Sequence, residues 1–108
     1  MNQGIYEQLQ QVARERGIIH YGPVAQMADL DMSQQADRTE IGRILGEISE
    51  HEHEAGRPLI SAVVILKDAN KPGPGFFTLA RNLGLIQPDE DDDAFWNAEL
   101  QRVWDEWS

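Results

Sequence analysis

The sequence predicts a small α+β domain of winged-helix type with an added acidic helix at its C-terminal end. The first observation is the order of predicted elements: a helix, a short strand, two consecutive helices, a buried strand and a loop rich in glycine and proline. The second is the length of 108 residues, which suits one domain with one hydrophobic core. The third is a hydrophobic fraction of 41% with three tryptophans and three phenylalanines, which is typical of a folded chain.

The first third of the chain predicts a helix, a short strand and a second helix. An apolar face with helical spacing, followed by Gly17, predicts the first helix over residues 2–17. The apolar stretch IIHY at residues 18–21 predicts a strand. Gly22 and Pro23 then begin a second helix, because proline is tolerated in a first helical turn. The predicted buried side chains of these two helices are Ile5, Leu9, Val12, Val24, Met27 and Ala28.

The middle of the chain predicts a longer helix and a buried strand. Asp37 and Glu40 have the spacing of a capping box, which predicts that the third helix opens at Asp37. Gly56 and Pro58 end this helix. The stretch LISAVVIL at residues 59–66 does not alternate with polar residues, so it predicts a strand that is buried on both faces. The predicted apolar stripe of the third helix consists of Ile41, Ile44, Leu45 and Ile48.

The last third of the chain predicts a loop and two helices. Residues 67–75 read KDANKPGPG and must form a loop, because glycine and proline dominate their second half. Residues 76–84 predict a short helix that ends at Gly84. Three aspartates at residues 91–93 favour the positive end of a helix dipole and predict the start of the last helix. This helix belongs to an acidic C-terminal segment at residues 89–108.

The charge of the chain opposes a nucleic-acid function, because binding a polyanion depends on lysine and arginine. The formal net charge is −10. Residues 89–108 contain eight acidic residues and one basic residue, whereas residues 1–88 contain eleven acidic and eight basic residues. Most of the acidity therefore lies in the last segment, and the predicted winged-helix core at residues 18–77 lies in the mildly negative part.

Composition also excludes several classes of site. The chain has no cysteine, which excludes disulfides, thiolate zinc sites and cysteine nucleophiles. The N-terminal residues lack the pattern of a signal peptide, and the longest apolar run is too short to cross a bilayer. We therefore expect a cytoplasmic protein that does not associate with a membrane.

Three motifs and a glycine-rich turn occur in a fixed order over residues 18–77. The motifs are IHYGPVAQMADL, EIGRILGEI and RPLISAVVI, and the turn runs into GFF. This order resembles the C-terminal winged-helix domain of the O6-alkylguanine-DNA alkyltransferases and their alkyltransferase-like relatives. That family carries a Tyr-Gly-x-x-Ala helix start, a helix with Val-Gly-x-Ala-Leu and a Pro-Cys-His-Arg strand. The resemblance implies a domain that contacts DNA beside a flipped nucleotide.

The resemblance assigns roles to a few residues and removes others. Tyr21 falls where the family has a tyrosine that touches the DNA backbone. Ala62 falls where the acceptor cysteine would stand. The family's intercalating arginine corresponds to Thr39, and Arg38 lies one residue early. Since alkyl transfer needs an activated thiolate, the resemblance implies at most a non-catalytic reader.

The candidates for nucleic-acid binding are one aromatic residue and four cations. In a winged helix the second helix of the pair enters the major groove, and the wing adds contacts. The same cations could be ordinary solvated charges, since residues 38–81 contain six basic and six acidic residues. The predicted nucleic-acid-binding residues are Tyr21, Arg38, Arg43, Lys67 and Lys71.

No set of residues predicts an active site, a metal centre or a cofactor. Glu47, His51 and Glu54 could share one helix face, but they match no known ligand motif. Ser61 lies in an apolar stretch without an evident acid or base partner. We therefore expect a non-enzymatic protein with no cofactor and no bound metal.

The C-terminal helix carries a broad aromatic face. Its apolar residues recur at helical spacing, and tryptophan is enriched at binding hot spots. The helix could close the core, or its face could bind a partner. The leading hypothesis is a regulatory module that binds another protein or a second copy through this face or the acidic surface, and the alternative is an alkyltransferase-like nucleic-acid reader. The predicted interaction residues are Trp96, Leu100, Val103, Trp104 and Trp107.

Overall fold

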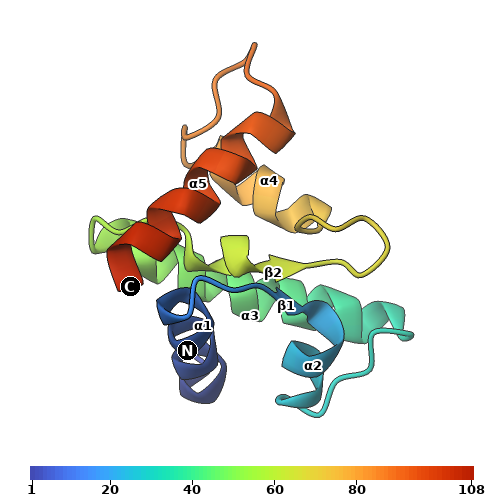
Figure 1. Cartoon of the computed structure of the whole chain (residues 1–108). Helices are drawn as coiled ribbons and strands as arrows, with labels where there is room; N and C mark the ends of the chain where they lie inside the picture. The colour runs from blue at the N-terminus through green and yellow to red at the C-terminus, as the bar shows by residue number, and fades with distance from the viewer.

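The computed structural model describes all 108 residues and has the predicted α+β composition (Figure 1). Five α-helices surround one 3₁₀ helix and a sheet of two short parallel strands. In chain order the elements are α1 (Gln3–Arg14), β1 (Ile19–His20), α2 (Tyr21–Gln26), α3 (Gln35–Glu54), η1 (Ile60–Val63), β2 (Val64–Ile65), α4 (Pro74–Asn82) and α5 (Asp92–Trp107). No helix in the chain has both the length and the apolar composition needed to cross a membrane.

The segment formed by η1 and β2 is the centre of the molecule. In β2, Val64 pairs with Ile19 of β1 and Ile65 pairs with His20. The 3₁₀ helix η1 contacts α1, α3 and α5. In Figure 1, α3 runs behind the two strands, α4 and α5 lie above them, and α1 and α2 lie below. Residues 59–65 are all buried, which confirms the predicted burial on both faces.

The predicted eight-residue strand at residues 59–66 is wrong in its extent, since only Val64 and Ile65 form a strand. The preceding N–H groups bond to side chains from other helices instead of to a neighbouring strand. The Leu59 N–H donates to Glu99 Oε2 at 2.8 Å, and the Ser61 N–H donates to Ser49 Oγ at 3.1 Å. Because buried N–H groups need acceptors, these two side chains permit the 3₁₀ turn.

The starts of two helices differ from the prediction. The capping box is wrong, because α3 begins at Gln35 and neither predicted carboxylate caps it. Asp37 instead accepts a hydrogen bond from the Asp31 N–H at 2.9 Å, and Glu40 pairs with Arg43. Helix α4 begins at Pro74 rather than at residue 76, since proline fits a first helical turn.

The core contains most of the predicted side chains. Ile5, Leu9, Val24 and the whole stripe of α3 are buried. Val12 and Ala28 are only partly buried, and Met27 is exposed over 46% of its surface. Met27 is the C-cap residue of α2, and the buried residues of this helix are Val24 and Ala25.

Helices α1, α3 and α4 end with the hydrogen-bond pattern of a Schellman motif, in which one residue adopts a left-handed conformation, and the turn after α2 repeats it with Asp29. Gly56 and Gly84 occupy this position after α3 and α4, with φ of 78° and 74°. After α1, however, Arg16 has φ of 53°, and Gly17 follows one residue later. A non-glycine residue rarely adopts this conformation, so tertiary contacts must hold Arg16 in place.

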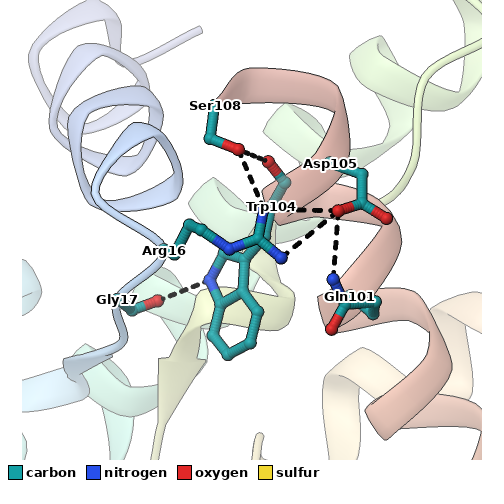
Figure 2. A network of polar contacts seen from close by, with 6 residues as sticks. All are labelled: Arg16, Gly17, Gln101, Trp104, Asp105 and Ser108. Carbon is teal, nitrogen blue, oxygen red and sulfur yellow. Dashed lines mark hydrogen bonds and ion pairs between the residues drawn. The ribbon is translucent and has the colours of Figure 1, made fainter.

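Figure 2 shows those contacts, which join the end of α1 to the end of α5. Arg16 Nη1 donates to Asp105 Oδ1 at 3.3 Å and to Ser108 Oγ at 2.9 Å. Its guanidinium also lies over the Trp104 ring, 5.6 Å from the ring centroid. The Trp104 indole N–H donates to the Gly17 carbonyl at 2.9 Å. The predicted acidic C-terminal helix therefore packs onto the body of the domain.

Candidate functional site

A cavity of about 160 Å³ lies between α2, α3, η1 and the start of α4. A dry cavity of about 150 Å³ accepts benzene in other proteins, so this volume suits a single ring. Ile41, Leu45, Phe76 and Leu79 give it apolar walls. The side chains of Tyr21, Met32, Arg38, Ser61 and Leu66 complete the lining together with backbone at Gly42, Gly46 and Gly73–Gly75.

Glycines form part of the cavity wall. Gly42 and Gly46 are one turn apart in the middle of α3, and Gly75 lies in the first turn of α4. A β-carbon added at any of these positions would meet no atom within 4 Å apart from its chain neighbours and the backbone of its own helix. Since glycine destabilises a helix interior relative to alanine, packing within this chain does not explain Gly42 and Gly46. Their absence of side chains leaves the backbone of α3 open to a ligand.

The polar groups in the wall are chiefly hydrogen-bond donors. Tyr21 Oη accepts from the Gly73 N–H at 3.1 Å, so its own hydroxyl hydrogen can point to a ligand. Burial raises the pKa of Tyr21, which keeps the hydroxyl protonated. Ser61 Oγ accepts from the Ser49 hydroxyl at 2.6 Å, which leaves the Ser61 hydrogen available as well. A ligand that offers acceptor atoms would satisfy both hydroxyls.

The rim of the cavity carries an unneutralised cation. Arg38 donates to the Met32 carbonyl at 2.8 Å and to the Gln35 side-chain carbonyl at 2.7 Å, and both partners are neutral. Among the nine lysines and arginines, only Arg14, Arg38 and Lys67 form no ion pair. Arg38 therefore keeps its full positive charge at the entrance.

The structure brings together only part of the predicted nucleic-acid-binding set. Tyr21 and Arg38 both line the cavity. Lys67 follows Leu66, a lining residue, and Lys71 pairs with Leu66 across the turn in an antiparallel bridge. Arg43 is separate, because it lies in another groove and bonds to Glu40 at 2.8 Å. Its charge is thus largely neutralised.

The predicted interaction residues of α5 face the rest of the chain. Leu100 and Val103 are buried in the core. The Trp96 indole donates to the Ala62 carbonyl at 2.9 Å, and Trp104 is bonded as described above. The guanidinium groups of Arg14 and Arg57 each lie 5.8 Å from the centroid of the Trp107 ring. These contacts give the stripe a role in folding, and its binding of a partner stays a prediction.

The residues considered for a metal site do not form one. His51 packs edge-to-face on Tyr6, and Glu47 Oε1 lies 3.4 Å from the N-terminal amine. The structure contains no group of three histidine, aspartate or glutamate side chains that could hold a metal ion.

Sequence reasoning missed several cavity residues, above all Ser61 as a lining group and the three glycines. The one available signal was the pair of glycines in an otherwise strong helix, since such residues usually have a packing or functional reason. The position of these glycines in the wall of one cavity depends on the fold and has no local signal.

The three sequence motifs and the glycine-rich turn at residues 18–77 all contribute to the cavity. The first supplies Tyr21, the second supplies Gly42 and Gly46, the third supplies Ser61, and the turn before GFF supplies Gly75. The chain matches no family model, no curated protein and no solved structure.

Proposed function

We propose that this chain is a non-enzymatic nucleic-acid-binding module that takes one unstacked base into the cavity. The observation that carries the proposal is the convergence of Tyr21, Arg38 and the α3 glycines on a cavity of single-ring size. In this proposal α2 and α3 are the helix pair of a winged helix, and the turn between Leu66 and Lys71 is a short wing.

The cavity has the physical properties that base recognition needs. Proteins that read an extruded base hold it between apolar or aromatic side chains and bond to its polar edge. Ile41, Leu45 and Phe76 would contact the ring, and the Tyr21 and Ser61 hydroxyls would donate to its acceptors. A single strand would be preferred, since no base pair must be broken first.

The net negative charge should lower the affinity for nucleic acid, but it does not argue against the cavity as the binding site. Arg38 and Lys67 are free to contact phosphates, whereas most of the acidic surplus lies in residues 89–108. Phosphate contacts supply most of the affinity of such proteins and make it salt-dependent. We therefore expect weak binding that falls as salt is added, with a modest slope set by these two cations.

The position matched to the acceptor cysteine cannot perform alkyl transfer. Ala62 has no nucleophilic atom, and it is completely buried. Its carbonyl accepts the Trp96 indole N–H, which gives this position a structural partner. Binding without chemistry is therefore the proposed activity.

Fluorescence anisotropy with labelled single-stranded and duplex DNA at two salt concentrations tests the proposal. Arg38→Gln should weaken binding and lower the slope of log affinity against log salt by about 0.7–0.9. Arg14→Gln is the matched control, since Arg14 also forms no ion pair but lies on α1, away from the cavity. Absence of binding at the lowest salt, or an equal loss in both variants, would overturn the proposal.

A second candidate is a protein-interaction module that binds a basic partner through its acidic surface. The observation that favours it is the run of carboxylates at residues 89–93, which stands before and at the start of α5. Opposite charges on two surfaces speed association. Amide chemical shifts during titration with a lysine-rich peptide should then change in residues 89–93, and sedimentation velocity would detect binding to a second copy. Unchanged spectra and a monomer at all concentrations would count against this candidate.

A further inference from the structure

The acidic first turn of α5 pairs with two cations beside the cavity. Lys71 Nζ lies 3.3 Å from Asp93 Oδ1, and Arg81 Nη2 forms an ion pair with Asp92. Lys71, Arg81 and Asp92 line a shallow hollow together with Thr78. This hollow shares the lining residues Leu66 and Pro74 with the cavity, so the two lie next to each other.

Helix chemistry alone does not explain these pairs. Aspartates in a first turn stabilise a helix through its dipole, and Asp91 caps α5 by accepting the Ala94 N–H at 3.0 Å. This accounts for acidic residues at the start of α5. Stabilisation of the helix start does not explain why these aspartates pair with cations from the loop and from α4, next to the cavity.

The pairs are also weak enough to open. The four side chains keep between 38% and 56% of their surface exposed. Exposed ion pairs contribute little to stability and are screened by salt. Lysine and arginine bind phosphate oxygens with the same donors that they offer to a carboxylate. A phosphate that approaches this hollow therefore competes directly with Asp92 and Asp93.

We propose that Asp92 and Asp93 are an internal competitor that occupies a phosphate-binding surface made by Lys71 and Arg81. This inference rests on the proposed function, because the phosphate would belong to the nucleotide next to the one whose base enters the cavity. In the free protein the carboxylates neutralise both cations. A bound strand displaces them, so the acidic segment lowers affinity and selects for strands that also fill the cavity.

The direct test compares two double variants that change the net charge equally. Asp92→Asn/Asp93→Asn frees Lys71 and Arg81, and Glu7→Gln/Glu15→Gln removes two exposed carboxylates of α1 and its C-cap. By anisotropy at about 50 mM salt we expect the first variant to bind single-stranded DNA about tenfold more tightly than the wild type, with a salt slope steeper by about 1–2. The second should change affinity by less than about threefold, because distant charges are screened.

Adding Lys71→Gln/Arg81→Gln to the Asn variant should abolish the gain, and circular dichroism checks that each variant folds. Equal gains in both double variants, or a gain that survives loss of the two cations, would overturn the inference while leaving the proposed function intact.

A second probe keeps the inference testable if no variant binds DNA, which would refute the proposed function. Inorganic pyrophosphate, added to the ¹⁵N-labelled wild type and Asn variant, should shift the amides of Lys71, Arg81 and the first turn of α5, with tighter binding in the variant. If pyrophosphate shifts none of these amides in either protein, Lys71 and Arg81 do not form a phosphate surface.

Discussion

Replacing the two cavity glycines of α3 by alanine should stabilise the protein and weaken its binding. Neither Gly42 nor Gly46 has another atom within 4 Å of an added β-carbon, so Gly42→Ala/Gly46→Ala creates no clash. Each glycine in a helix interior costs roughly 0.5–1 kcal/mol relative to alanine. The double variant should therefore gain about 1–2 kcal/mol in free energy of unfolding. For small domains, about 1 kcal/mol corresponds to a rise of roughly 4–8 °C in Tm.

The same two methyl groups would occupy the cavity wall from which the α3 backbone is accessible. Urea denaturation followed by tryptophan fluorescence measures the stability, and anisotropy with single-stranded DNA measures the binding. Gly4→Ala is the control, because Gly4 is a helical glycine of α1 whose added β-carbon would make an ordinary 3.7 Å contact with Asn2 Oδ1. It should leave DNA binding unchanged.

Two results would refute this reasoning. A less stable Gly42→Ala/Gly46→Ala variant would mean that the space beside α3 is not open. A more stable variant with unchanged DNA binding would mean that the space is open but is not where the base binds.

Three further predictions concern the fold. The Trp104→Phe variant should lose about 1 kcal/mol more free energy of unfolding, measured in urea, than the Trp107→Phe variant, because of these two indole N–H groups only that of Trp104 has a hydrogen-bond partner. Equal losses in the two variants would contradict this prediction. Ser49→Ala should cost about 1–3 kcal/mol, since it removes the acceptor of a buried N–H, and a neutral result would show that water replaces it. Burial raises the pKa of both Tyr6 and Tyr21, so above pH of about 10 the unfolded chain loses these protons first. The contribution of the two tyrosines to the free energy of unfolding should be constant below that pH and should fall as the pH rises through their pKa values in the folded state. A free energy of unfolding in urea that does not decline at high pH would refute this prediction.

Local signals in the sequence predicted the helices well. Gly56 and Gly84 mark the ends of α3 and α4, and the last helix begins at the predicted aspartates, with Asp91 as its N-cap. These features depend on a few neighbouring residues. The end of α1 is different, because Arg16 takes the left-handed position that a glycine usually occupies. Its contacts come from Asp105 and the rest of α5, which no local pattern records.

The broken strand and the cavity depend on residues that are distant in sequence. The stretch at residues 59–66 has the composition of a strand, but the Ser49 hydroxyl and the Glu99 carboxylate bond to its N–H groups and permit a 3₁₀ turn. The cavity likewise needs Gly46 of α3 and Gly75 of α4 on one surface. The family resemblance suggested Tyr21, and the predicted winged helix suggested Arg38, but neither could show that the two residues share this cavity.

The most direct test of the central claim is a ¹⁵N–¹H correlation spectrum recorded during titration with a short single-stranded DNA. If a base enters the cavity, the largest shifts should occur at the amides of Gly42, Gly46, Ser61 and Gly75, which line it from α3, η1 and α4. Shifts that leave these four amides unchanged, or a spectrum that does not respond to DNA, would contradict the account.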